Sequence, residues 1–333
     1  MLKIGLIGAG SMGGVHNSCY AALSRTHDVA VIAAADLRPE MLEQAAKLWP
    51  KAALYRSGME LLEKERPDAV DICLPTYLHA GHALKAMEKG CDVFIEKPLC
   101  LSVKDADMLL ETQKKHNSRV MIGHVLRFMP EYRFLKEAKE SGEYGELQSL
   151  VMQRIMGRAD NSGGWDKWFL DSERSGSVIV DLHIHDADFA RWVLGEPKGF
   201  KLGARKNAGG FFEQMIAIFD YGEKMVSAEA CWDYKQGFPF VMSYRAGFEK
   251  ATMVYDSSLD PKLKVFNAGG EKIIPPLFEH REEELRNLTG YYDELQYFIE
   301  QCTAKKPIAH CTLEEGVKTI KLVLSEFSEA QRS

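Results

Sequence analysis

The sequence predicts an α/β domain with a parallel sheet, followed by an α+β domain with a mostly antiparallel sheet. Three observations support this fold class. The chain has 333 residues, which is long for a single hydrophobic core. Its first part alternates short apolar runs with amphipathic helical segments, as in a parallel sheet covered on both faces. Its later part contains strand-like runs without helices between them, which is typical of an antiparallel sheet.

The first domain is predicted to span residues 1–123. Its predicted strands are Lys3–Ile7, Val29–Ala35, Ala69–Cys73, Val93–Ile95 and Val120–Ile122. Helical periodicity predicts helices at Tyr77–Lys89 and Ser102–His116. Ser102 and Asp105 have the spacing of a capping box at the start of the second helix.

The second domain is predicted to span residues 124–333. Its predicted helices are Pro130–Ser141, Asp181–Leu194, Glu283–Gln301 and Leu313–Ser328. Its predicted strands are Leu147–Met156, Phe211–Phe219, Met225–Trp232, Phe240–Arg245, Thr252–Tyr255 and Leu263–Phe266. A loop rich in Gly, Asp, Asn and Ser is predicted at 157–164. The C-terminal helix of the second domain can pack against the first domain.

Composition and charge exclude several classes of function. Lys and Arg number 42 against 48 Asp and Glu, a net charge of −6, and without a basic run we expect no nucleic-acid partner. No apolar stretch reaches the roughly 18 residues of a membrane helix, and we expect neither membrane association nor a signal peptide. The seven cysteines are scattered without zinc spacing, which predicts reduced thiols in the cytoplasm.

A glycine motif follows the first predicted strand and begins a helix. It has the form GxGxxG, with Gly8, Gly10 and Gly13 as its glycines and Ser11 and Met12 before the last of them. The first glycine allows a tight turn, the second a close approach to a pyrophosphate, and the third close packing of helix and strand. The helix N-terminus then supplies N–H donors to the anion. Together these features predict a dinucleotide on a Rossmann domain.

An acidic residue ends the second predicted strand. Asp36 lies about 20 residues beyond the last glycine, where a carboxylate accepts hydrogen bonds from the adenosine ribose 2′-hydroxyl. A carboxylate there repels a 2′-phosphate, so NAD is favoured. Arg38 leaves NADP open, because a nearby arginine accommodates that phosphate.

Further cofactor contacts are expected beyond the carboxyl ends of the parallel strands, where ligands of open α/β sheets bind. The residues predicted there are Leu74, Pro75 and Thr76 after one strand and Glu96 and Lys97 after another. Pro98 restricts Lys97 to extended conformations. We therefore expect the Lys97 amine to face the cofactor.

A second informative segment contains Asp181, His183, His185 and Asp188. As a strand it would place the first three on one face, as in a metal site. As a helix beginning with Asp181 as N-cap, it would align Asp181, His185 and Asp188. The apolar stripe that follows favours the helix, so we expect no metal. An aspartate cap with a solvated helical face is the remaining structural alternative.

A histidine beside carboxylates suits general acid–base chemistry near neutral pH. The unperturbed imidazole pKa lies close to that pH, and a carboxylate orients the ring and stabilises the imidazolium. Hydride transfer from an alcohol needs such a group, because the hydroxyl proton must leave as the hydride does.

These motifs together resemble the Gfo/Idh/MocA oxidoreductases, the family of glucose–fructose oxidoreductase and inositol dehydrogenase. The resemblance covers most of the chain and rests on Gly8–Gly13, Asp71–Thr76 followed by His79, Glu96-Lys97-Pro98, Gly123-His124 with Arg127-Phe128, and Asp181 with His185. One departure is Ser175-Gly176-Ser177, where many relatives have a run of glycines.

The resemblance implies hydride transfer between nicotinamide and a hydroxyl- or carbonyl-bearing carbon of a sugar or cyclic polyol, as in inositol dehydrogenase. It implies that Lys97 hydrogen-bonds the reacting hydroxyl, that His185 is the general base or acid, and that Asp181 supports His185. It also implies a cofactor contact at His79, a cis bond before Pro98, an open-faced second sheet and a homo-oligomer, either a dimer or a tetramer.

Four further residues are weaker substrate-side candidates: Arg127, Trp165, Trp168 and Asp188. For the two tryptophans, structural packing is an equal alternative. Two other classes of function remain open for the chain: a dinucleotide-binding regulator without catalysis, and a glycosidase that holds and recycles NAD.

Overall fold

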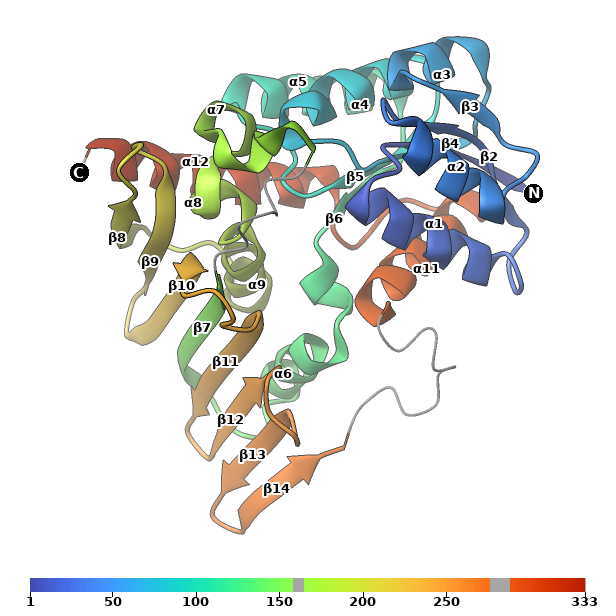
Figure 1. Cartoon of the computed structure of the whole chain (residues 1–333). Helices are drawn as coiled ribbons and strands as arrows, with labels where there is room; N and C mark the ends of the chain where they lie inside the picture. Colours follow the sequence, from blue (N-terminus) through green and yellow to red (C-terminus); the bar gives the residue numbers. More distant parts are fainter. Residues whose placement is uncertain (158–164, 276–287, 333) are drawn as a thin grey trace. The chain divides into compact units, whose positions relative to one another are not determined.

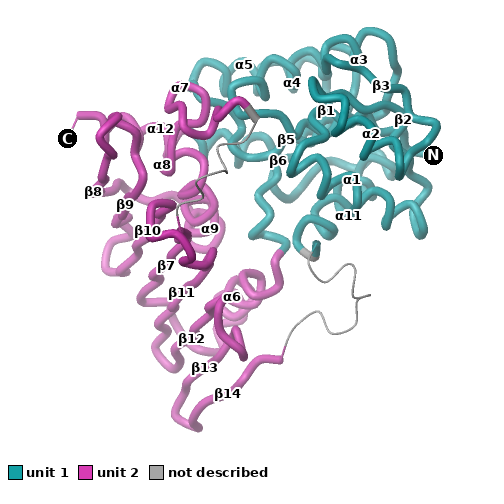
Figure 2. The backbone as a smooth tube through the Cα atoms, in the orientation of Figure 1, with its two compact units in different colours: residues 1–128, 282–320 teal, residues 129–281, 321–333 magenta. Residues whose placement is uncertain are grey.

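The chain folds into two units, which Figure 2 colours separately. The computed structural model describes residues 1–157, 165–275 and 288–332. Unit 1 comprises Met1–Phe128 and Glu282–Ile320, and unit 2 comprises Met129–Arg281 and Lys321–Ser333.

Unit 1 is built on a six-stranded parallel sheet (Figure 1). Its strands are β1 (Leu2–Ile7), β2 (Val29–Ala35), β3 (Ala53–Tyr55), β4 (Ala69–Ile72), β5 (Asp92–Glu96) and β6 (Val120–Gly123). Their order is β3-β2-β1-β4-β5-β6, and every neighbouring pair is parallel. The order reverses between β1 and β4, which is where ligands bind in sheets of this topology.

Helices cover both faces of this sheet (Figure 1). They are α1 (Ser11–Leu23), α2 (Pro39–Leu48), α3 (Gly58–Lys64), η1 (Thr76–Leu78), α4 (His79–Glu88), α5 (Val103–His116), η2 (Val125–Phe128) and α11 (Thr289–Thr303). Helix α4 contacts α3 and α5, whereas α1 contacts α2 and α11. At the start of α5, the Ser102 hydroxyl accepts the Asp105 N–H at 3.0 Å, which confirms the predicted cap.

Unit 2 contains a mostly antiparallel sheet with the order β14-β13-β12-β11-β7-β10-β9-β8. Its strands are β7 (Leu147–Gly157), β8 (Phe200–Lys206), β9 (Phe212–Tyr221), β10 (Lys224–Tyr234), β11 (Val241–Phe248), β12 (Ala251–Asp256), β13 (Leu263–Asn267) and β14 (Gly270–Ile274). The pair β7–β10 is parallel and the other neighbours are antiparallel. The predicted fold class is thus confirmed.

Helices of unit 2 pack on its sheet. The helical elements of this unit are α6 (Pro130–Ser141), η3 (Trp165–Leu170), α7 (Ser172–Ser175), α8 (Ser177–Asp181) and α9 (Ile184–Leu194). Helix α8 packs on β9 and β10, and α9 packs on β7 and β10. Helix α12 (Leu313–Arg332) continues from unit 1 into unit 2.

The predicted helix Asp181–Leu194 is wrong at its start. Asp181 is the last residue of α8, and Leu182 and His183 separate α8 from α9. Asp181 is therefore not an N-cap. The strand alternative for this segment is also wrong, because both flanking segments are helical.

Three strands were not predicted: β3, β8 and β14. All three lie at sheet edges, and much of each is exposed. Such strands lack the apolar alternation that marks a half-buried strand. Parts of two predicted segments, 158–164 of the loop and 283–287 of the helix, lie outside the described residues.

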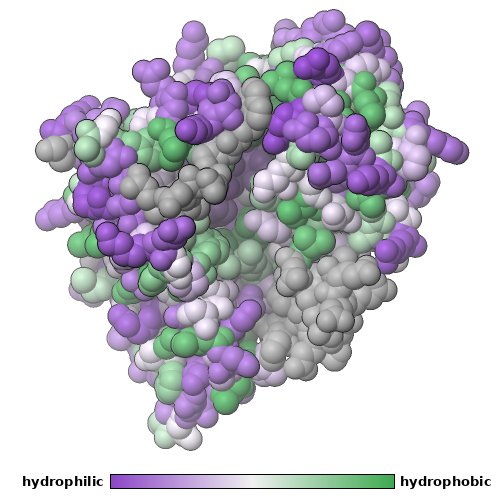
Figure 3. Space-filling model, viewed as in Figure 1, coloured by the Kyte–Doolittle hydropathy of each residue, from purple (hydrophilic) through white to green (hydrophobic). Residues whose placement is uncertain are grey.

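The face drawn in Figure 3 is largely polar. On the face drawn in Figure 3, hydrophilic residues predominate and hydrophobic ones lie in scattered groups. Within the described ranges, no helix has both the length and the apolar character needed to span a bilayer.

Candidate functional site

The turn between β1 and α1 has room only for glycine at two positions. Gly8 has φ +91°, and a Cβ there would lie 2.6 Å from the Cys73 carbonyl oxygen. A Cβ on Gly13 would lie 1.8 Å from the Gly8 carbonyl oxygen. At Gly10 the nearest atom is instead the end of a flexible side chain, Arg38 Nη2. The turn thus fits a pyrophosphate approaching the N-terminus of α1.

Asp36 is held in place beside this turn. Its Oδ2 accepts the Ala9 backbone N–H at 3.0 Å, and its Oδ1 accepts the backbone N–H and the Nε–H of Arg38 at 2.9 and 3.1 Å. The carboxylate is oriented before any ligand arrives, and its charge is partly balanced by Arg38. This arrangement suits recognition of a ribose hydroxyl.

His79 connects two loops at the carboxyl edge of the sheet. Its ring is buried, with Nδ1 2.7 Å from the Pro98 carbonyl oxygen and Nε2 2.6 Å from that of Leu74. Burial lowers the pKa of His79, and the two backbone hydrogen bonds act in the opposite direction. The ring thereby ties the segment after β4, with Pro75 and buried Thr76, to the segment after β5.

Glu96 and Lys97 stand at the carboxyl end of β5, one strand from β4 and two from β1. Glu96 is buried, and its Oε2 accepts the Lys97 backbone N–H at 3.0 Å. Lys97 is partly exposed. The Lys97–Pro98 peptide bond is cis, as the family resemblance implied.

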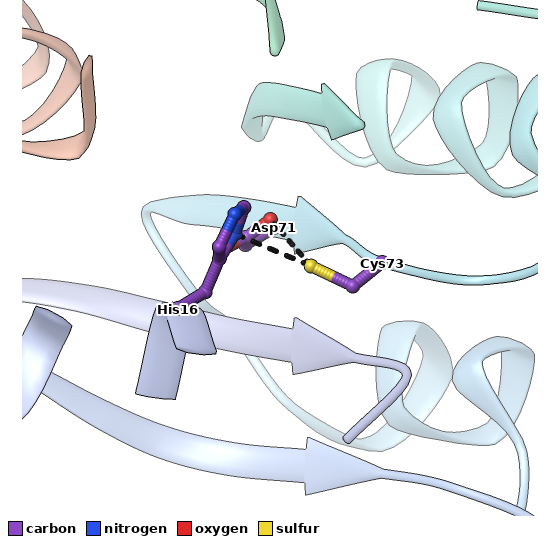
Figure 4. Close-up of side chains that lie close together, drawn as sticks. All are labelled: His16, Asp71 and Cys73. Carbon is purple, nitrogen blue, oxygen red and sulfur yellow. Dashed lines mark hydrogen bonds and ion pairs between the residues drawn. The ribbon is translucent and has the colours of Figure 1, made fainter. Parts of the chain in front are cut away.

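The sequence analysis did not predict a buried cluster of polar side chains between α1 and the end of β4. Figure 4 shows His16, Asp71 and Cys73, whose side chains point toward one another. Asp71 gave a usable signal, because a carboxylate within the apolar strand β4 needs a buried partner. The position of His16 on α1 gave none.

The break between α8 and α9 places its polar residues in different surroundings. His183 is fully buried, with Nε2 3.2 Å from a Glu326 carboxylate oxygen. His185 is partly exposed, and Asp181 is 8% exposed. Asp181 and His185 are therefore the members of this segment with access to solvent, whereas His183 holds α12.

Helix α9 is also anchored to the sheet by a buried ion pair. Arg154 on β7 donates to both carboxylate oxygens of Asp186, at 3.0 and 3.2 Å. The two side chains are 2% and 0% exposed. Residues on both sides of His185 in the sequence, His183 and Asp186, are thus fixed by buried partners.

The weaker substrate-side candidates come from different elements. Arg127 in η2 is 7% exposed and lies 3.6 Å from Glu315, and Asp188 is buried in α9. Trp168 stacks on Phe169 with ring centroids 4.0 Å apart. Trp165 begins η3, and its side chain lies outside the described part of the chain. Their contacts with substrate stay predictions.

The parallel sheet, the glycine turn and the oriented Asp36 define a dinucleotide-binding protein with a second, α+β unit. Residues 2–124 match the model of the Gfo/Idh/MocA oxidoreductase family described as an NAD-binding Rossmann fold, and residues 132–254 match the C-terminal domain of the same family. The chain belongs to the Gfo/Idh/MocA oxidoreductase family. This finding confirms the resemblance and the NAD-binding domain.

Two relatives indicate the range of activities in this family. The chain is 28% identical over 233 residues to D-glucoside 3-dehydrogenase of Escherichia coli K12, a match covering 67% of this chain and 65% of that protein. It is 31% identical over 195 residues to myo-inositol 2-dehydrogenase of Thermotoga maritima, covering 59% and 55%. The matches thus span less than two thirds of either relative.

Solved structures agree on the fold. Levoglucosan dehydrogenase in complex with NADH and levoglucosan superposes with a TM-score of 0.87, covering 99% of this chain and 97% of that one. The two sequences are 18% identical, so this likeness supports the fold alone.

Proposed function

We propose that this protein is an NAD-dependent dehydrogenase or reductase acting on a CH–OH group of a sugar or cyclic polyol. The observation that carries the proposal is the position of Lys97 at the carboxyl end of β5, on the sheet edge that also carries the glycine turn. The names of the two relatives, a glucoside and an inositol dehydrogenase, support this substrate class.

The residues at the turn bind and orient the cofactor in this proposal. Backbone N–H groups at Gly10, Ser11 and Met12 face the pyrophosphate, and Asp36 accepts from the adenosine ribose. Because Asp36 repels a 2′-phosphate, we propose NAD over NADP. When bound, the nicotinamide accepts or supplies the hydride.

The proton is moved by the chain's own groups. The Lys97 ammonium donates a hydrogen bond to the reacting oxygen, which stabilises negative charge as it develops there. His185 takes the hydroxyl proton during oxidation and returns it during reduction. Asp181, the end of α8, orients the His185 ring and stabilises its imidazolium form.

Two further expectations stay part of this proposal. The seven free cysteines support a cytoplasmic location. A homo-oligomer is supported by apolar side chains that the sheet of unit 2 leaves exposed, with Ile216, Ile218 and Met225 45%, 49% and 66% exposed.

The test is a screen of inositols, glucosides and anhydrosugars, with NAD and NADP, for a change in NADH or NADPH absorbance. On the substrate found, Lys97→Ala and His185→Ala should each lower kcat about 100-fold while NAD still binds, given the usual size of acid–base contributions. Lys104→Ala and His116→Ala are the matched controls. Near-normal turnover in both site variants would refute the assigned roles. Substrate loss without net NADH change would favour the NAD-recycling glycosidase.

A further inference from the structure

A buried polar cluster links three elements of unit 1 to the residue before Lys97. It consists of His16 from α1, Asp71 and Cys73 from β4 and the position after it, Glu96 from β5 and Glu294 from α11. His16, Asp71 and Glu294 have no exposed surface, and Glu96 is 4% exposed. None of these residues was needed for the proposed chemistry.

His16 bridges two carboxylates through its two ring nitrogens. Its Nδ1 lies 2.8 Å from Asp71 Oδ2, and its Nε2 lies 3.1 Å from Glu96 Oε1. The Cys73 thiol lies 3.3 Å from both His16 Nδ1 and Asp71 Oδ1 (Figure 4). The imidazole therefore connects α1 to the ends of two neighbouring strands.

The cluster holds more acidic groups than basic ones. Within the described ranges, no lysine or arginine pairs with Asp71, Glu96 or Glu294, and His16 is the one basic partner of the first two. Aromatic rings surround it, with Phe94 packed edge-on against His16 at 5.5 Å. Unbalanced charge in such surroundings is costly and favours uptake of a proton.

The protonation states follow from these neighbours. Burial alone would lower the pKa of His16, but Cys73 and Asp71 outweigh it and raise that pKa well above its usual value. Burial, and then the Asp71 charge, raise the pKa of the Cys73 thiol, whereas His16 acts in the opposite direction. Burial, and then the Glu96 charge, raise the pKa of Glu294 well above its usual value.

Glu294 also has an unusual hydrogen-bonding position. Neither of its carboxylate oxygens has a hydrogen-bond donor among the described residues, and Glu96 Oε1 likewise has none. The polar atoms of His16, Glu96 and Glu294 lie within 4.8 Å of one another. A proton on Glu294 supplies an O–H donor to this cluster, in which Glu96 Oε1 has no hydrogen bond although His16 Nε2 lies 3.1 Å from it.

We propose that His16 and Glu294 are positioning residues for Lys97. The His16 imidazolium and the uncharged Glu294 acid hold the Glu96 carboxylate from α1 and α11, and Glu96 Oε2 holds the Lys97 backbone N–H at 3.0 Å. The hydrogen bond to Glu96 thereby restrains the Lys97 backbone. The Lys97 side chain then extends from a backbone position that does not move. The inference rests on the proposed catalytic role of Lys97.

A divalent cation bound by His16, Glu96 and Glu294 is the competing explanation of the same geometry. Metal binding requires a neutral ring nitrogen on His16. A ring between two carboxylates favours the imidazolium instead, and Glu294 is neutralised by a proton without any further ligand. The observations therefore favour the proton.

The test compares His16→Asn, Glu294→Leu and Glu294→Gln in the full-length protein. His16→Asn and Glu294→Leu should each lower kcat about tenfold with little change in NAD affinity, as expected when a catalytic group is misplaced. Glu294→Gln should keep kcat near the parent value, because its amide still donates to Glu96. His116→Asn and Glu300→Gln are matched controls at a partly exposed and an exposed helical position, respectively.

Two further measurements decide the protonation state. Infrared difference spectra should contain the carbonyl band of a protonated carboxylic acid, sensitive to D₂O and absent from Glu294→Gln. Metal analysis of the purified protein should find no stoichiometric cation. A bound cation that Glu294→Gln removes, or the absence of the acid band, would overturn the proposal.

Lys97→Ala separates this inference from the proposed function. Full turnover by Lys97→Ala would refute the catalytic role of Lys97 and with it the positioning role. An inactive Lys97→Ala protein together with parental kcat in His16→Asn and Glu294→Leu would refute the positioning role alone. If His16→Asn does not fold, the Glu294 pair and the infrared band still decide the outcome.

Discussion

The two units bury charge in different ways. In unit 2, two fully buried carboxylates each have a basic partner of their own: Asp186 pairs with Arg154, and Glu326 lies beside His183. In unit 1, the single imidazole of His16 serves two carboxylates, and a third carboxyl group lies nearby. The buried pair of Arg154 and Asp186 has balanced charge, whereas the cluster in unit 1 holds more acidic groups than basic ones.

This difference indicates two kinds of dependence on conditions. Removing one partner of a matched pair leaves an uncompensated buried charge, which costs several kcal/mol at any pH where that charge persists. The cluster in unit 1 instead couples stability to pH, because its acid ionises more easily in the unfolded chain. The variants below test these two behaviours in order of expected size.

The largest effect is expected from Arg154→Met in unit 2. This change leaves Asp186 buried and unpaired, so the free energy of unfolding should fall by about 3–5 kcal/mol. Chemical denaturation measures the loss, and the double variant Arg154→Met/Asp186→Asn should recover part of it. Arg245→Met, an exposed arginine on the neighbouring strand β11, is the control. A loss below about 1 kcal/mol would show that the pair is not needed.

A smaller, pH-dependent effect is expected from Glu294→Gln in unit 1. The ordinary pKa of 4.5 applies to the unfolded chain, and the folded pKa is raised above it. Below pH 4.5 the Glu294 carboxyl keeps its proton, and the full stability of the folded protein is present. This contribution to stability is lost as the pH rises through the pKa of Glu294 in the folded protein. Glutamine cannot ionise, so the variant should gain stability over the parent by up to about 1.4 kcal/mol per pH unit in this window.

Denaturation of Glu294→Gln and the parent from pH 4.5 to pH 8 measures this gain. Exposed Glu300 lies on the same helix, and Glu300→Gln should show no comparable slope. A difference between Glu294→Gln and the parent that stays constant with pH would contradict the protonated state of Glu294.

The sequence predicted those parts of the molecule that local patterns determine. A short apolar run predicted β2 at its observed bounds, and the glycine spacing predicted the turn at Gly8 that the backbone requires. The edge strand β14 was missed because most of its residues are exposed. For strands of this kind, pairing with a neighbour rather than side-chain burial decides the structure.

The residues of the candidate site also fall into those that local patterns predict and those that depend on distant contacts. The candidates Lys97 and Asp36 follow predicted strands, so strand prediction was enough to place them at the sheet edge. His183, in the break after Asp181, contacts Glu326, which lies 143 residues away in the sequence. His16 and Glu294 likewise come from opposite ends of the chain. Periodicity cannot reveal such contacts, because they are decided by tertiary packing.

The smallest effect is expected from Ser177→Gly, which changes unit 2 without changing charge. Ser177 has φ +64° and is fully buried, and its hydroxyl has no hydrogen-bond partner within the part of the chain that the structure describes. Glycine adopts this conformation without steric cost, so stability should rise by about 1 kcal/mol, after the greater freedom of the unfolded chain is included. Ser177→Ala keeps the backbone strain and removes only the hydroxyl, so it separates the two contributions. Because no ionisable group changes, the gain should be the same at pH 5 and pH 8, in contrast to Glu294→Gln. A loss of stability in Ser177→Gly would mean that the hydroxyl, not the backbone, determines the choice of serine here.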